Sequence, residues 1–217
     1  MIGRVQIILF LLILTLCSCI KKVERPAQLD SRRYYPLNVE DVYIYSGKFR
    51  TVVTSGQYGD LYTRTYLDST GDLLMWEDLK VNSEGVYLNN RIIVNGDIPE
   101  IHFEPPLPVA PWSDLIGDTL HFTTWEVRSD SINSHLRAHV EYEIIDIEDL
   151  TLPAGEFPRC IKVRMNYRTV DVGAARLLDG ESMFWYAQDV GIVKFITPAE
   201  SGELLQATIG EKTYPLE

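Results

Sequence analysis

The chain has 217 residues, of which 31 are acidic and 20 are basic, and its formal net charge at neutral pH is −11. A chain this acidic offers no basic patch for the phosphates of nucleic acid or of an anionic membrane, so we expect no nucleic acid partner. The sequence also contains no nucleophile elbow, no phosphate-binding glycine loop and no His-Glu-x-x-His zinc motif. We therefore expect a non-enzymatic protein without a cofactor.

The N-terminus is typical of a secretory signal. One basic residue, Arg4, precedes an apolar run over residues 5–16. A run of about a dozen residues matches the central region of a signal peptide and is shorter than the roughly 20 residues with which a helix spans a membrane. We expect residues 1–18 to be a signal peptide that is removed on export.

The end of this run resembles the lipobox of bacterial lipoproteins. Leu16, Cys17 and Ser18 precede Cys19, which places a branched apolar residue at −3 and a small residue at −1. Cys17 is the poorer acceptor, because Leu16 would then stand at −1. An ordinary cleaved signal peptide and an uncleaved anchor are the alternatives.

The lipobox resemblance implies that Cys19 is lipidated with diacylglycerol and palmitate-like chains, which hold the protein in the cell envelope. In enterobacteria an Asp after the cysteine would favour the inner membrane. Ile20 stands there instead, so we expect the outer membrane if the source has one.

The remaining chain divides into a tether and one domain. Residues 19–33 are polar and lack periodicity, so we expect a lipidated flexible tether. Residues 34–217 show a dominant period of two, which predicts a single all-β domain, mainly antiparallel. The predicted strands cover residues 42–45, 49–54, 61–67, 73–77, 85–88, 91–94, 119–127, 182–187, 192–197 and 204–209.

Turn residues separate these strands, among them Gly59-Asp60, Asn89-Asn90 and Ser201-Gly202. Short strands at this spacing predict a curved meander sheet or half-barrel with few short helices. Residues 174–178 form at most one such helix.

The middle segment, residues 104–111, contains prolines at positions 105, 106, 108 and 111. Proline donates no backbone hydrogen bond, so we expect an extended connector and not a paired strand. A polyproline ligand for a partner is the alternative. Asp41 before this segment and Asp118 after it each precede an alternating strand, which predicts two successive meanders in one sheet.

The next predicted strand places His135, Arg137, His139, Glu141 and Glu143 on one face. Two histidines four residues apart bind zinc on a helix, but on a strand Arg137 lies between them and its charge opposes a metal ion. We expect a solvated face and no metal site.

The alternation is clearest over residues 161–168, where apolar side chains occupy every odd position. Upstream, the phase slips at Ile144-Ile145, which predicts a bulge, and residues 153–156 predict the turn between these two strands.

Two further residue types are weighed as sites. With Cys17 removed and Cys19 acylated, Cys160 has no partner for an intrachain disulfide, and we expect a spectator thiol and not a catalytic one. The aromatic residues, four tryptophans and many tyrosines, could line a ligand groove or stack on sugars, but in a sheet they are also ordinary core and cross-strand residues, which we favour. The tryptophans are Trp76, Trp112, Trp125 and Trp185.

Four segments resemble a broad group of uncharacterised bacterial lipoproteins with a β-rich domain. These segments are residues 34–37, the proline-rich run up to 116–118, residues 152–157 and residues 184–194. Similar proteins often read Trp-Tyr-Ala-Pro-Gly-Val-Gly in the last segment, where this chain has Gln188-Asp189. The resemblance implies a strongly curved antiparallel sheet, similar to the half-barrel of periplasmic lipoprotein carriers. It implies no activity and no ligand-binding residue.

Three hypotheses for the function follow. The first is an envelope lipoprotein whose curved sheet binds a hydrophobic ligand or an envelope protein. The second is a structural or assembly role, which requires a flat exposed apolar patch. The third is a hydrolase, which requires carboxylates or histidines clustered in a polar cleft.

Overall fold

The computed structural model describes residues 29–47, 51–56, 59–94, 100–129, 135–170 and 178–215. They form one antiparallel sheet of 13 strands that follow one another in chain order. The strands are β1 (Val42–Tyr45), β2 (Thr51–Gly56), β3 (Leu61–Leu67), β4 (Leu73–Val81), β5 (Val86–Ile93), β6 (Glu100–Pro108), β7 (Thr119–Arg128), β8 (His135–Leu152), β9 (Gly155–Thr169), β10 (Gly180–Ala187), β11 (Gly191–Ile196), β12 (Ser201–Ile209) and β13 (Lys212–Tyr214).

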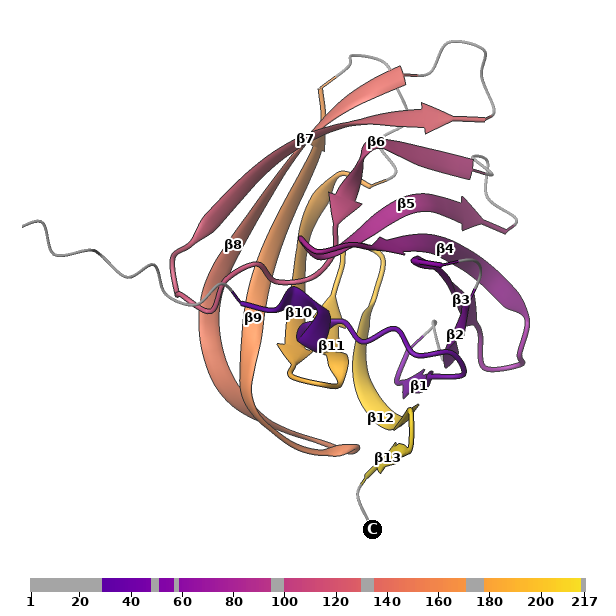
Figure 1. Cartoon of the computed structure of the whole chain (residues 1–217), viewed down its shortest axis with the longest axis vertical. Coiled ribbons are helices and arrows are strands. Elements are labelled where there is room, and N and C mark those ends of the chain that lie inside the picture. The colour runs from indigo at the N-terminus through magenta and orange to yellow at the C-terminus, as the bar shows by residue number, and fades with distance from the viewer. Residues whose placement is uncertain are drawn as a thin grey trace, which may run out of the picture.

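The sheet curls into a nearly closed barrel (Figure 1). Each strand pairs with the next, and β1 also pairs with β12, with Val42 opposite Thr208. The first strand is thus hydrogen-bonded on both edges, which removes the open edge that a half-barrel would have. The predicted all-β antiparallel meander is confirmed, and its curvature is more complete than that of a half-barrel.

The long hairpin of β8 and β9 forms as the alternation predicts. Val163 and Tyr167 are buried, whereas Arg168 is exposed. The register between the strands shifts between Ile144 and Asp146, where the bulge was predicted. The turn at residues 153–154 joins the two strands.

The prediction that the proline-rich segment is an unpaired connector is wrong for its first half. Leu107 and Pro108 pair with Leu88 and Tyr87 of β5, while Glu104 pairs with Trp125 of β7. Between these pairs, residues 105–106 have no register partner on either side. The two prolines occupy an irregularity in the ladder, where no backbone donor is needed.

The predicted turn at Asn89-Asn90 is also wrong, because β5 runs through it. The registers to β4 and β6 both skip Asn89, which makes it a bulge. Asn90 continues the strand, because its side-chain amide donates to Asp78 at 3.2 Å and its Oδ1 lies 2.6 Å from Nδ1 of His102.

Ser201-Gly202 begins β12 and does not form the predicted turn, which lies just upstream, where the Thr197 amide donates to the Glu200 carbonyl. Gly202 is required by packing: a Cβ there would approach the ring of Phe195 to 2.5 Å. The glycine therefore lets an aromatic ring lie against the backbone.

A short 3-10 helix, η1 (Ser31–Tyr34), precedes the sheet and lies beside β11 (Figure 1). Arg33 in this helix donates to both carboxylate oxygens of Asp189, at 2.9 and 2.6 Å. Ser31 is buried, so residues 29–33, at the end of the expected tether, pack against the domain.

Several predictions fall on residues outside the described ranges. They concern the signal peptide, Cys19 and most of the tether, the start of the strand at 49–54, and residues 174–177 of the short helix. In the part of the chain that is described, no helix is long and apolar enough to cross a membrane.

Candidate functional site

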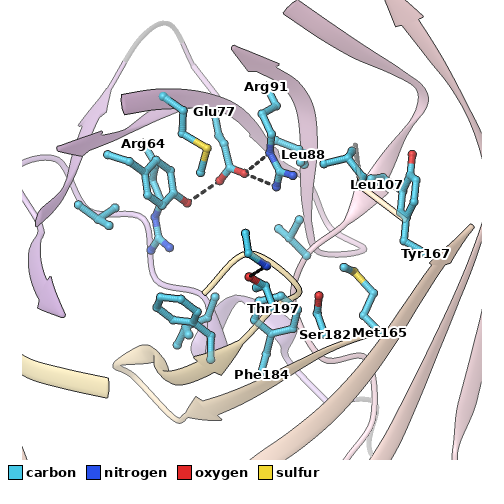
Figure 2. Close-up of a pocket in the computed structure, with 18 of the residues that line it drawn as sticks. Arg64, Glu77, Leu88, Arg91, Leu107, Met165, Tyr167, Ser182, Phe184 and Thr197 are labelled. Atoms are coloured by element: carbon cyan, nitrogen blue, oxygen red, sulfur yellow. Dashed lines mark hydrogen bonds and ion pairs between the residues drawn. The ribbon is translucent and has the colours of Figure 1, made fainter. Parts of the chain in front are cut away.

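The curved sheet encloses a cavity of about 360 Å³ on its inner face. Figure 2 shows Arg64, Glu77 and Arg91 along one wall, with Ser182 and Phe184 along the facing wall. Most lining side chains are aromatic or aliphatic, including Tyr35, Tyr45, Tyr66, Met75, Leu88, Ile93, Leu107, Val109, Tyr142, Met165, Tyr186 and Ile192. The size falls within the roughly 300–1,000 Å³ of small-molecule sites.

Tyrosine hydroxyls around the cavity are used to hold the backbone. Tyr142 donates to the Pro108 carbonyl at 2.9 Å, and Tyr186 donates to the Val109 carbonyl at 3.0 Å. The hydroxyl of Tyr45 donates to the Ile192 carbonyl at 2.7 Å. The first two bonds fix the end of β6 and the residue after it as one wall, and the third joins β1 to β11. All three leave the rings to present apolar surface.

The charged wall arises from strand register. Thr54 of β2 lies opposite Arg64 of β3, Arg64 opposite Glu77 of β4, and Glu77 opposite Arg91 of β5. Directly opposite residues in antiparallel strands point to the same face of the sheet. The pairing therefore gathers two guanidinium groups and one carboxylate inside the barrel.

Glu77 is fully engaged by two neighbours. Nε and Nη2 of Arg91 donate to Oε1 of Glu77 at 2.9 and 2.5 Å. The Tyr66 hydroxyl donates to the other oxygen, Oε2, at 2.6 Å. Burial, reinforced by the Glu77 carboxylate, raises the pKa of Tyr66 well above its ordinary value, so this phenol stays neutral.

Arg64 has no such acidic partner. Its side chain is almost completely buried, and Nη2 donates to the Pro36 carbonyl at 3.0 Å. The guanidinium carbon lies 4.1 Å from the ring centroid of Tyr35 and 5.1 Å from that of Tyr43. These ring faces attract the cation but carry no negative charge of their own.

A second buried charge cluster lies at β7. Nε and Nη2 of Arg128 donate to Oε2 of Glu126 at 2.9 and 2.6 Å, and both side chains are almost inaccessible. The Tyr167 hydroxyl, from a cavity-lining residue, donates to Oε1 of Glu126 at 2.6 Å. This ion pair is complete within the protein.

None of the four tryptophans lines the cavity. The interpretation as core residues holds for two of them, but as the sole role it is wrong for tyrosines such as Tyr66 and Tyr142, which line the cavity. Trp185 is buried and its Nε1 donates to Glu148 at 2.6 Å, and Trp112 packs edge-on against Tyr142 at 5.9 Å. Trp125 is an exposed side chain on β7.

The other candidates lie away from the cavity. His135, Arg137 and His139 are exposed on one face of β8, as expected of a solvated face. The described residues contain no group of three or more His, Cys, Asp or Glu side chains that could hold a metal ion.

The Cys160 thiol is buried and donates to the Phe157 carbonyl at 3.3 Å. Burial is the main cause that raises its pKa to about 12, with Glu148 and Asp149 adding to the effect. The thiol therefore stays protonated at neutral pH, and a protonated, buried thiol is a poor nucleophile.

Arg64, Glu77 and Arg91 are not among the site residues predicted from the sequence. A signal for Arg64 was present, because it stands between Tyr62 and Tyr66 in the phase that β3 turns towards the core. A charge in the apolar phase of an alternating strand is unusual, since buried charge is costly unless it is paired.

The chain matches no family model and no curated protein. Among solved structures, it is similar to a "putative lipoprotein" from Parabacteroides distasonis, at 16% identity over 83% of this chain and 100% of the other, with a TM-score of 0.47. A "putative exported protein with YmcC-like fold" from Bacteroides fragilis is 16% identical over 80% of this chain and 97% of the other, with a TM-score of 0.44. At these scores the likeness is partial, so the proposals below rest on the residues of this chain.

Proposed function

We propose that the mature protein is a lipid-anchored envelope lipoprotein whose β domain binds a small hydrophobic ligand in the cavity, without catalysing a reaction. The proposal for the anchor rests on Leu16-Cys17-Ser18-Cys19 at the end of the apolar run. The proposal for the ligand rests on one observation: a cavity of about 360 Å³ with a mainly apolar lining. Burial of each methylene of a ligand there would contribute about 0.8 kcal/mol.

The hydrolase alternative has weaker support from the site. Glu77 is the carboxylate among the described lining residues, and both of its oxygens are already hydrogen-bonded. Two-carboxylate hydrolysis requires a second acid about 5–10 Å away. The structural role has weaker support as well, because most of the exposed large apolar side chains, such as Val39, Leu73 and Ile196, belong to different segments, and Leu115 and Ile116 form a pair of two residues.

The test uses residues 19–217 with Cys19→Ser, so that no attached lipid competes for the cavity. Native mass spectrometry and organic extraction would detect a ligand retained from the cell. Titration with the neutral fluorophore N-phenyl-1-naphthylamine would then measure the affinity of the emptied cavity. We expect a saturable site of one fluorophore per chain.

Met165→Trp places a larger ring in the cavity and should weaken fluorophore binding by at least about tenfold. Ile196→Trp is the matched control, because Ile196 is exposed on β11 and does not line the cavity. Absence of both a retained ligand and saturable binding would refute ligand binding and favour a protein partner, to be sought by crosslinking from the membrane-anchored form.

A further inference from the structure

Arg64 is a buried cation that the protein does not neutralise. Its side chain is 3% exposed, it lines the cavity, and its Nε has no hydrogen-bond partner. No carboxylate in the described parts of the chain forms an ion pair with it. An isolated buried charge is strongly unfavourable, so such a group requires an explanation.

The neighbours of Arg64 leave its charge uncompensated. The one carboxylate beside it, Glu77, is opposite Arg64 in the ladder but is engaged by Arg91 and Tyr66. The phenols of Tyr35 and Tyr43 are neutral at physiological pH, because the pKa of a tyrosine is ordinarily about 10 and burial raises it further. Two guanidinium groups and one carboxylate leave this wall with a net charge of about +1.

Other polar atoms at the same place also lack partners. The hydroxyl of Tyr43, whose ring lies beside the guanidinium, is buried without a hydrogen bond. The same holds for the hydroxyl of Thr54, the ladder partner of Arg64. Buried polar atoms are hydrogen-bonded in the great majority of cases, so a cluster without partners indicates an incomplete polar site.

Other arginines of this protein bind carboxylates through the edge of the guanidinium group that carries Nε and Nη2. Arg33, Arg91 and Arg128 each use Nε and Nη2 to hold one carboxylate. In Arg64, Nε is buried without a hydrogen-bond partner and Nη2 donates to Pro36. The Nε–H is therefore an unused donor on the same edge, which a carboxylate oxygen can accept once the side chains that cover it move aside.

We infer that the ligand is an amphiphile with a single carboxylate, which binds Nε and Nη2 of Arg64, and a hydrocarbon chain, which fills the cavity between Leu107, Met165 and Phe184 (Figure 2). This inference rests on the proposed function and names the ligand class for the same site. The carboxylate supplies the charge that the wall lacks, and the chain covers the apolar lining.

The test compares dodecanoate, dodecanol and dodecylamine as competitors of N-phenyl-1-naphthylamine, on the chain from residue 19 with Cys19→Ser. A charge-assisted hydrogen bond to a buried cation should make dodecanoate bind about 10- to 100-fold more tightly than dodecanol. Dodecylamine should bind most weakly, because its ammonium would face Arg64.

Arg64→Met should reduce the ratio between acid and alcohol to about one, while the affinity for the neutral fluorophore changes by less than about threefold. Arg168→Met is the matched control, because Arg168 is exposed on β9, and it should leave the ratio unchanged. If Arg64→Met does not fold, the order of the three competitors in affinity for the native protein still tests the carboxylate assignment.

The outcomes separate the inference from the proposed function. Equal affinity for dodecanoate and dodecanol would overturn the carboxylate assignment and leave hydrophobic ligand binding intact. A preference for the acid that persists in Arg64→Met would also overturn it. No displacement of a bound fluorophore by any of the three compounds would overturn the assignment of a carboxylate amphiphile. Ligand binding in the cavity is refuted only if the protein retains no ligand and binds no fluorophore saturably.

Discussion

The two clusters of buried charge inside the sheet differ in one respect. At β7, Glu126 has both oxygens bonded, by Arg128 and Tyr167, and the charges cancel. At β3, Arg64 is as deeply buried as Arg128, at 3% and 6% exposure, but it has no carboxylate of its own. The first cluster is complete within the protein, and the second is not.

This difference separates a structural role from a binding role. A buried ion pair contributes little net stability over an apolar replacement, yet loss of one partner is strongly destabilising. An unpaired buried cation lowers the stability of the empty protein, and a ligand that supplies the counter-charge can restore it. A buried charge without a counter-charge in the protein is a feature expected at a ligand-binding site.

Removal of Arg128 should have the largest effect on stability. Arg128→Met leaves Glu126 charged and completely buried, with Tyr167 as its remaining donor. We expect the free energy of unfolding in urea to fall by about 3–5 kcal/mol. The double variant Glu126→Met with Arg128→Met should recover most of this loss, and a loss below about 1 kcal/mol in the single variant would contradict a closed ion pair.

Removal of Arg64 should have a smaller effect of the opposite sign. Arg64→Met abolishes two cation–π contacts, worth about 0.5–2 kcal/mol each, but it also abolishes the desolvation cost of an unpaired charge, which is several kcal/mol. We expect the ligand-free variant to be at least as stable as the native protein in urea unfolding. Dodecanoate should then stabilise the native protein more than the variant.

A loss of stability in Arg64→Met as large as that in Arg128→Met would show that the two clusters do not differ. It would assign Arg64 to the core as a structural residue, held by Pro36 and the two tyrosine rings.

Most of the fold followed from local sequence, because alternation and turn chemistry act over a few residues. The strand at residues 61–67 and the bulge after Ile144 are such cases. The errors came from tertiary partners that local sequence does not display. Asn90 continues β5 because Asp78 and His102 satisfy its side chain.

The site was not predictable in the same way, because it depends on register across four strands. The alignment of Thr54, Arg64, Glu77 and Arg91 is a property of three successive hairpins and their bulges. A shift of one residue in any hairpin would turn a charge to the outer face. The sequence shows charges in an apolar phase, but not which of them remains unpaired.

An exposed ion pair gives the smallest effect and a reference for the buried ones. Asp189 has a positive φ of 61°, and its carboxylate binds Arg33 of η1. Both side chains are about half exposed, so solvent screens the pair. Asp189→Asn should lower the midpoint of thermal unfolding by about 1–2 °C at low salt.

The pH and salt dependence identify the cause of that small change. The hydrogen bond from Arg33 lowers the pKa of Asp189, so the pair stabilises the fold above the pKa of a free carboxyl, about 3.9, and the effect is lost as pH falls further. The difference between the native protein and Asp189→Asn should therefore vanish in 1 M NaCl, and it should shrink as pH falls below about 3.9 through the lowered pKa. The effect of Arg128→Met should persist in 1 M salt, because a buried pair is screened much less. If the difference in thermal midpoint between the native protein and Asp189→Asn survives both conditions, the backbone of the turn is responsible, and not the charge. Asp189→Gly removes the carboxylate but suits the positive φ, so this variant would then be more stable than the native protein.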